Sequence, residues 1–183
     1  MIKLVSGWLT QENTDRLVAE LDSLSLDQRA IKIQDREIAM PRLTGWCNDF
    51  EFGYRYSGQE TPVMPWPTLL KQLRDTLQDQ LDKRLPAVLI NKYRDGNDSV
   101  GWHRDNEEWF RSDPFIVSVS LGATRTFNMR NRTRDQKASF DLANGDLLVF
   151  SNEHVLDWEH TIPKTTKPVG VRYNLTFRTI IVS

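Results

Sequence analysis

The segment Gly101-Trp102-His103-Arg104-Asp105 contains two side chains that could bind one metal ion together. If this segment is a β-strand, His103 and Asp105 point to the same side, because side chains alternate along a strand with a period of two. An imidazole and a carboxylate are two of the three ligands in the set of two histidines and one carboxylate that holds iron(II) and leaves coordination positions open. The third ligand must come from elsewhere in the chain.

The chain has 3 histidines, so the second imidazole is either His154 or His160. Local sequence alone leaves both candidates open. A mononuclear zinc hydrolase uses the same three ligand types, so the ligands by themselves do not identify the metal.

The last predicted strand, Val171 to Ile180, indicates which organic molecule the site could bind beside the metal. Its alternation places Arg172, Asn174, Thr176 and Arg178 on one face, and Asn91 and Tyr93 share a face of an earlier strand. Arginine binds a carboxylate through two parallel hydrogen bonds, so Arg172 and Arg178 could hold the two ends of a dicarboxylic acid such as a 2-oxoacid. A hydrolytic zinc site needs no such clamp.

Hydrophobic periodicity predicts the elements that position these residues. We expect one helix over residues 10–24, with Thr10 as its N-cap, and a second helix that begins near Trp66-Pro67-Thr68. From Ala87 onward the chain reads as short strands, which favours a β-sandwich or barrel with two helices packed outside. The predicted strands cover residues 88–93, 115–121, 124–129, 138–142, 146–150 and 171–180, with a hairpin turn at Asn144-Gly145.

Composition limits the class of protein. A length of 183 residues favours a single domain, and a net charge of -1 excludes a globally basic nucleic-acid binder. The single cysteine, Cys47, suits a reducing compartment. We find no apolar run of membrane-spanning length and no secretory leader, so we expect a soluble intracellular protein, cytoplasmic or nuclear, with no membrane partner.

Several short motifs together resemble one family. They are Asn91-x-Tyr93, Asp95-Gly96, His103-x-Asp105, Ser118-x-Ser120-Leu121-Gly122, Gly145-Asp146-Leu147-Leu148, His160-x-x-Pro163 and Arg172-x-Asn174-Leu175-Thr176-Phe177-Arg178. In this order they resemble the AlkB family of iron(II)- and 2-oxoglutarate-dependent dioxygenases, and Pro41-Arg42 and Tyr54-x-Tyr56-Ser57-Gly58 extend the likeness more weakly.

The resemblance implies a mostly β fold with flanking helices (α+β), a double-stranded β-helix or jelly roll of the cupin-like kind. It also implies one domain over residues 1–183, in which residues 1–86 form an N-terminal extension and nucleotide-recognition lid and residues 87–183 form the jelly-roll catalytic core.

The resemblance assigns roles residue by residue. His103, Asp105 and His160 become the iron ligands and the catalytic centre, which would leave His154 in a loop or surface role. Arg178 and Asn91 would bind 2-oxoglutarate near the metal, whereas Arg172, Asn174 and Tyr93 would bind its distal carboxylate. The implied cofactors are Fe(II), 2-oxoglutarate as co-substrate, and O2.

Among the expected substrate contacts, Glu107 matches the family position that accepts a hydrogen bond from the exocyclic amine of a flipped base. Tyr54 and Tyr56 match an aromatic pair on the lid. We expect Tyr56 to stack on the base. Arg42 and Arg104 are further expected substrate contacts. Basic residues at Arg125, Arg130, Arg132, Arg134 and Lys137, and again at Lys164 and Lys167, are predicted to contact phosphates.

The expected activity is therefore oxidative demethylation of N-alkylated bases, such as 1-methyladenine and 3-methylcytosine, in DNA or RNA, with release of formaldehyde, succinate and CO2. The segment from Ile33 to Ile38 has no aromatic wedge, which mildly favours single-stranded substrates, although Ile33 or Ile38 could still wedge between base pairs. We expect a monomer. Two alternatives remain open from the sequence: a dioxygenase of the same fold that hydroxylates a protein or small molecule, and a non-catalytic nucleic-acid-binding module.

Overall fold

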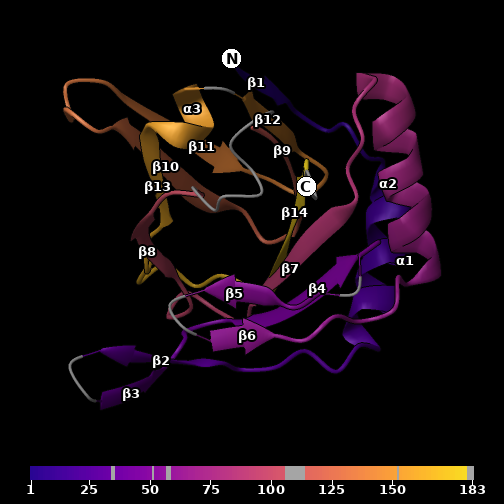
Figure 1. Ribbon diagram of the computed structural model, residues 1–183, viewed down its shortest axis with the longest axis horizontal. Coiled ribbons are helices and arrows are strands. Elements are labelled where there is room, and N and C mark those ends of the chain that lie inside the picture. The colour runs from indigo at the N-terminus through magenta and orange to yellow at the C-terminus, as the bar shows by residue number, and fades with distance from the viewer. Residues whose placement is uncertain (34–35, 51, 57–58, 106–113, 152, 181–183) are drawn as a thin grey trace.

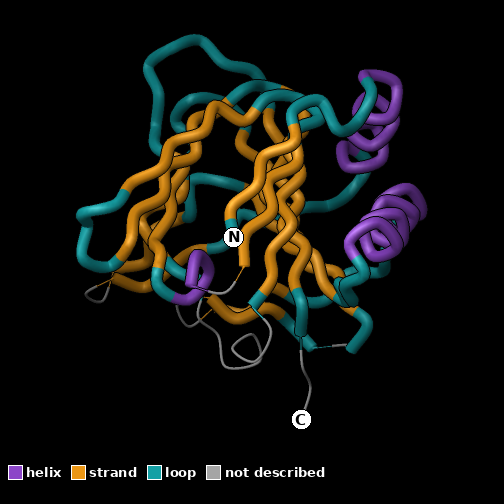
Figure 2. Tube along the Cα trace, turned by 90° about the horizontal axis from the view of Figure 1, so that it is seen from above, coloured by secondary structure: helices purple, strands orange, loops and turns teal. Residues whose placement is uncertain are grey.

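The computed structural model describes residues 1–33, 36–50, 52–56, 59–105, 114–151 and 153–180. These residues form two antiparallel sheets, and Figure 2 shows the two long helices on the outer side of one of them. The expectation of a mostly β fold with two flanking helices, arranged as a double-stranded β-helix, is confirmed.

The larger sheet has six antiparallel strands. Their order is β1 (Ile2–Val5), β12 (Leu147–Ser151), β9 (Phe115–Gly122), β14 (Arg172–Arg178), β7 (Ala87–Tyr93) and β4 (Leu43–Asn48). The smaller sheet has four strands in the order β11 (Lys137–Leu142), β10 (Arg125–Asn131), β13 (Trp158–Ile162) and β8 (Val100–His103).

Two short ribbons lie beside this body (Figure 1). One pairs β2 (Ala30–Ile33) with β3 (Arg36–Ala39), and the other pairs β5 (Tyr54–Tyr56) with β6 (Gln59–Thr61). Figure 1 shows that the β2–β3 ribbon projects on the side away from the helices.

Helices α1 (Gln11–Asp22) and α2 (Thr68–Leu81) agree with the two predicted helices. Thr10 caps α1 as expected, because its side chain accepts from the Asn13 amide. Pro67 is the N-cap of α2 and provides no side-chain cap. Instead, the carboxylate of Glu20 on α1 accepts from the amides of Leu69 and Leu70, at 2.8 Å and 2.9 Å. A third, short helix, α3, spans Glu153–Leu156. Among the described helices, none is both long and apolar enough to cross a bilayer.

Strand β14 lies between β9 and β7 and separates two environments. Tyr173, Leu175 and Phe177 belong to the apolar core that includes buried leucines of α1 and α2. The alternate residues of β14 point to the other side of the sheet, where a second apolar cluster joins residues of both sheets, Ile116 and Phe127 among them. The functional side chains of β14 therefore lie between the two sheets.

The predicted division at residue 86 does not coincide with a break in the larger sheet. Strands β1 and β4 come from residues 1–86, yet they form the two edges of the sheet whose centre is β14. Periodicity did not reveal these two strands, because each is short and has no clear alternation of apolar and polar residues.

The hairpin predicted at Asn144-Gly145 is wrong. A turn is present, since Asp146 donates to the Ala143 carbonyl and Gly145 has φ of 81°. However, β11 pairs with β10 in the smaller sheet, and β12 pairs with β1 and β9 in the larger sheet. The turn carries the chain from the smaller sheet to the larger one. Two hydrogen bonds hold it against the larger sheet and its helices: the Asn144 side chain donates to Thr14 of α1, and the Gly145 amide donates to the Ser120 carbonyl of β9.

The Glu20 cap predicts a measurable loss of stability. Replacing Glu20 with Ala leaves two amides at the start of α2 without their acceptor, so we expect the free energy of unfolding to fall by about 1–2 kcal/mol. Glu20→Gln keeps an oxygen acceptor and should lose less. Denaturant unfolding measures both effects. Asp79→Ala, an exposed change on α2, is the control and should cost less than about 0.5 kcal/mol; an equal loss in this control would contradict the cap.

Candidate metal and co-substrate site

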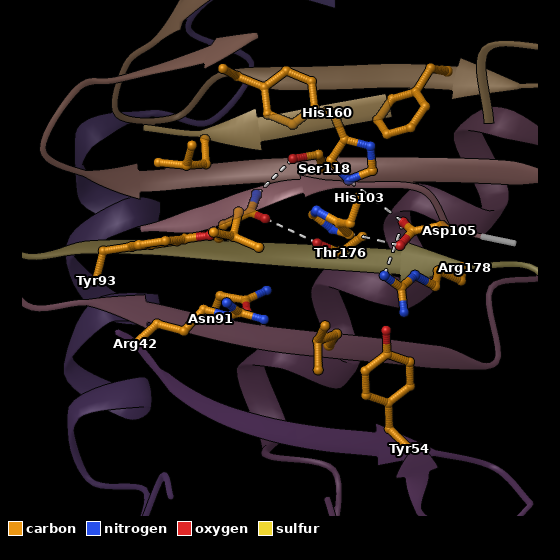
Figure 3. Close-up of a pocket in the computed structure, with 16 residues that line it drawn as sticks. Arg42, Tyr54, Asn91, Tyr93, His103, Asp105, Ser118, His160, Thr176 and Arg178 are labelled. Atoms are coloured by element: carbon orange, nitrogen blue, oxygen red, sulfur yellow. Dashed lines mark hydrogen bonds and ion pairs between the residues drawn. The ribbon is translucent and has the colours of Figure 1, made fainter. Parts of the chain in front are cut away.

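His103, Asp105 and His160 converge between the two sheets (Figure 3). One potential ligand atom from each residue lies within 4.8 Å of the others. His103 ends β8, His160 lies on β13, and the two residues are partners in the strand register. Asp105 lies two residues beyond the end of β8, so the strand is shorter than expected although the two side chains do converge.

The environment of this group favours neutral imidazoles and an ionised carboxylate. Burial lowers the pKa of His103, and burial together with the His103 charge lowers the pKa of His160 to about 3. Burial is the largest influence on Asp105 and by itself would raise its pKa, but the positive charges of Arg178, His160 and His103 together outweigh burial and the pKa falls to about 2. Metal ligands must be deprotonated, so the three side chains are in the protonation state that a divalent metal needs.

Neighbouring groups fix the orientation of the imidazoles. The Nδ1 of His103 lies 2.8 Å from the Gly101 carbonyl, which can only accept, so Nδ1 carries the hydrogen and Nε2 faces Asp105. His160 packs against the rings of Phe127 and Phe150, with centroid distances of 5.3 Å and 6.0 Å. These contacts hold both rings in place before any metal binds.

His154 is the alternative third ligand, and it lies elsewhere. Its Nδ1 is 3.1 Å from the N-terminal amine of Met1, and its ring packs against Trp158 with a centroid distance of 5.0 Å. The structure therefore favours His160, as the family resemblance implied.

The predicted co-substrate residues lie along the same pocket. Asn91, Tyr93, Asn174 and Arg178 line it, and the register pairs Asn174 with Asn91. Arg178 donates to Asp105 at 3.0 Å. Tyr93 lies at the opposite end (Figure 3), and its register partner is the fully buried Arg172. The two arginines of β14 therefore lie toward opposite ends, as a dicarboxylate clamp requires.

The pocket fits a bound dicarboxylate. The Nη2 of Arg172 donates to Ser120 at 2.9 Å, but Nε and Nη1 have no hydrogen-bond partner among the described residues. Buried guanidinium groups are costly unless an acceptor satisfies them, and a carboxylate accepts two parallel hydrogen bonds from one guanidinium. Two imidazoles and one carboxylate at the other end suit iron(II).

Arg42 and Tyr54 lie in the wall of this pocket. Arg42 is buried and its Nε donates to the Asn91 side chain at 3.0 Å. Tyr54 is 4% exposed, and the guanidinium carbon of Arg178 lies 5.1 Å from the centre of its ring. Figure 3 shows the Tyr54 hydroxyl directed toward Arg178. Both residues thus contact residues that are predicted to bind the co-substrate. That they also contact the substrate base stays a prediction.

The predicted phosphate contacts, and the predicted substrate contact Arg104, do not form one surface patch. Arg130 donates twice to Glu159, and its guanidinium carbon lies 3.9 Å from the centre of the Trp102 ring. Arg104 is half-buried. Lys164 and Lys167 line a separate groove beyond the end of β13.

Arg125 does not fit the predicted role of a phosphate contact. It is only 3% exposed, and its guanidinium donates to three backbone carbonyls. The prediction was wrong because a run of basic residues in the sequence does not show which side chain of a strand points inward. Arg125 starts β10 and alternates with the more exposed Thr126.

Two predicted substrate residues have no described side chain. Glu107 lies outside the described residues, and only the backbone of Tyr56 is described, as the last residue of β5. Their assignments stay predictions.

Three supporting residues had no role in the sequence interpretation. Ser118 and Ser120 of β9 accept from Asn174 and Arg172, and Thr176 donates to Asn174 at 3.0 Å. The signal was present, because serines that alternate with valines in a buried strand mark a polar inner face. These hydroxyls orient the polar side chains of β14.

Comparisons with known proteins agree with this geometry. A model of the 2OG-Fe(II) oxygenase superfamily matches residues 2–178. Alpha-ketoglutarate-dependent dioxygenase alkB homolog 3 of Mus musculus is 32% identical in an alignment of 187 residues that covers 97% of this chain and 65% of that protein. DNA oxidative demethylase ALKBH2 of Homo sapiens is 33% identical in an alignment of 153 residues that covers 79% of this chain and 59% of that protein.

The chain therefore spans about 65% of the length of the alkB homolog 3 proteins that it matches. Among solved structures, that of OsALKBH1 superposes with a TM-score of 0.70 at 17% identity and covers 97% of each chain, which supports the fold. The family's description names iron(II) and 2-oxoglutarate, and together with the three-residue group this confirms the predicted cofactors Fe(II), 2-oxoglutarate and O2.

The metal group predicts which residues control metal affinity. Because loss of a residue that only supports a ligand costs metal affinity about 10–100-fold, removing the ligand in Asp105→Asn or Asp105→Ala should weaken Fe(II) binding at least about 100-fold. Anaerobic calorimetric titration measures this, and thermal unfolding checks that the variants fold. His154→Ala is the matched control and should bind Fe(II) as the wild type does. The reverse pattern would move the site to His154.

Proposed function

The chain belongs to the 2OG-Fe(II) oxygenase superfamily, and we propose that it oxidatively demethylates N-alkylated bases, such as 1-methyladenine and 3-methylcytosine, in DNA or RNA. The carrying observation is one pocket with the His103, Asp105 and His160 group toward one end and Tyr93 at the other. Tyr93 lies beside the buried Arg172, two of whose side-chain nitrogens have no hydrogen-bond partner among the described residues. The likeness to proteins named alkB homolog 3 and DNA oxidative demethylase supports the substrate class.

The protein's part in this reaction is to bind, orient and exclude water. When bound, iron(II) and 2-oxoglutarate supply the oxidising power with O2, so that the N-methyl carbon is hydroxylated and lost as formaldehyde while 2-oxoglutarate becomes succinate and CO2. Arg178 and Asn91 orient the co-substrate near the metal ligands, and Tyr93, Asn174 and Arg172 hold its distal carboxylate. Phe127 and Phe150 keep the space around His160 apolar.

The base must leave its stack to reach this pocket. Unstacking costs a few kcal/mol and costs least for a damaged or single-stranded base, which favours the lesion over normal bases. We assign stacking on the flipped base to Tyr56, with Tyr54 as the second ring of the pair, and recognition of its exocyclic amine to Glu107. Arg42 and Arg104 are further substrate contacts, and Arg130, Lys164 and Lys167 contact the phosphates.

We favour single-stranded substrates because of the β2–β3 ribbon. Residues 33–38 contain no aromatic side chain, and the exposed Ile38 of β3 is only a small apolar wedge. A ribbon that inserts no ring between base pairs gives little compensation for opening a duplex. We further propose a monomer that works inside the cell, in the cytoplasm or the nucleus, where the buried Cys47 remains reduced.

A product assay tests this proposal. Anaerobically Fe(II)-loaded protein receives 2-oxoglutarate, O2 and matched single-stranded oligonucleotides with or without one 3-methylcytosine. We expect formaldehyde and succinate only with the lesion, and neither product from the Asp105→Ala variant. Succinate that does not depend on the lesion would point to a protein or small-molecule substrate, and no succinate at all would point to a non-catalytic binding module.

The phosphate contacts predict a change in salt dependence. If Lys164 and Lys167 each neutralise one phosphate, replacing both with Ala should weaken oligonucleotide binding and reduce the slope of log affinity against log salt by about 1.4 for a single strand. Fluorescence anisotropy at several salt concentrations measures this slope. Replacing the exposed Lys3 and Lys71 instead should leave it unchanged. An unaltered slope in the first variant would make both lysines ordinary solvated side chains.

A further inference from the structure

Tyr93 lies close to two buried guanidinium groups. The guanidinium carbon of Arg172 is 5.3 Å from the centre of the Tyr93 ring, and that of Arg125 is 5.7 Å from it. Arg172 is 0% exposed and Arg125 is 3% exposed. Tyr93 is at the end of the pocket opposite Asp105 and Arg178 (Figure 3). The ring therefore has two cations close to it, which restrict its position.

Arg125 also joins two loops. It donates to the carbonyls of Asp95 and Asp98 in the loop after β7, at 2.9 Å and 2.8 Å, and to the carbonyl of Pro163 after β13, at 2.7 Å. The same loops pack tightly beside it, since Thr165 donates to the Gly96 carbonyl and a Cβ on Gly96 would lie 2.4 Å from the Thr165 carbonyl oxygen. Arg125 is thus fixed from outside while its charge faces Tyr93.

The charge at this end of the pocket is not balanced by a directly bonded carboxylate among the described residues. Arg125 donates to neutral carbonyls, and Arg172 donates to a serine hydroxyl. Asp98 is the buried acid nearby, but Arg94 donates to it three times. Burial lowers the pKa of Arg172 to about 10 although Tyr93 acts to raise it, and the charge of Arg125 acts in the same direction as burial. Such an arrangement favours an anion beside Tyr93 and Arg172.

We propose that Arg125 is a positioning residue for 2-oxoglutarate, which holds the Tyr93 ring and adds positive potential where the distal carboxylate binds. This inference rests on the proposed function, because it concerns the co-substrate of the same pocket. It assigns to Arg125 a role different from that of Arg130 on the same strand, whose charge is matched by Glu159.

The test is the affinity for 2-oxoglutarate, measured by calorimetry under anaerobic conditions on the Mn(II)-loaded full chain. We expect Arg125→Met to raise the dissociation constant about tenfold and Arg125→Lys to raise it less, because lysine keeps the charge and loses the planar fork. The second ligand is 2-oxobutyrate, a 2-oxoacid without a distal carboxylate. Its dissociation constant should change less than about twofold, because the metal end of the pocket is unaltered.

Arg16→Met is the control, since it removes an exposed positive charge on α1 without changing the groups around Tyr93 and Arg125. It should leave the affinity for 2-oxoglutarate within about twofold of the wild type. In a Tyr93→Leu background, Arg125→Met should weaken binding less than it does in the wild type, because part of its effect passes through the ring. Thermal unfolding of each variant shows whether it folds.

The possible results distinguish a failure of the proposed role of Arg125 from a failure of the proposed function. Wild-type affinity in Arg125→Met, an equal loss for both 2-oxoacids, or an equal loss in Arg16→Met would overturn the role of Arg125 and leave the proposed function standing. A wild-type chain that binds no 2-oxoglutarate would overturn both.

Discussion

The alternation of side chains along β14 is the constraint on which the fold and the site both depend. This strand is buried on both faces, with Tyr173, Leu175 and Phe177 against the helices and the polar set Arg172, Asn174, Thr176 and Arg178 on the other side. A slip of one residue against β9 or β7 would exchange the two sets and place arginines in the apolar core. The cost of that exchange is so large that the register is specified by burial, and the register in turn places Arg172 beside Tyr93 and Asn174 beside Asn91.

The buried pair of Arg178 and Asp105 connects this strand to the metal ligands. Both side chains are 3% exposed and lie 3.0 Å apart. The pair helps to keep Asp105 ionised despite burial, and Arg178 also lies over the ring of Tyr54, which belongs to the β5–β6 ribbon. A buried ion pair of this kind contributes little net stability, because desolvation offsets most of the attraction. Its value here is positional, since one guanidinium orients a metal ligand and contacts an aromatic ring of the neighbouring ribbon.

The sequence predicted those parts of the molecule whose signal is local. Both long helices, most strands from Ala87 onward and the polar face of β14 follow from periodicity, and the spacing of His103 and Asp105 by itself indicated a pair of metal ligands. Strands β1, β4 and β13 were not predicted, because they are short and their partners are distant in the chain. The choice of His160 over His154 depended on resemblance, since only the fold shows that β13 brings His160 to β8. Arg125 was misassigned for the same reason: burial, which distinguishes it from Arg130, is set by the packing of loops that periodicity does not describe.

The distribution of charge explains why so many polar groups are buried in one place. Arg42, Arg125, Arg172 and Arg178 are buried in or beside the pocket, whereas Asp105 is the one carboxylate among its lining residues that the structure describes. A divalent metal at the three-residue group would increase this excess of positive charge, and a dicarboxylate would reduce it. Binding of the two is therefore coupled through electrostatics, and such coupling is reciprocal, so each favours the other by the same free energy. The excess of buried arginine is then a feature of the unliganded protein that makes the pocket selective for a doubly charged acid, because a monocarboxylate would leave the guanidinium groups beside Tyr93 without an anionic partner.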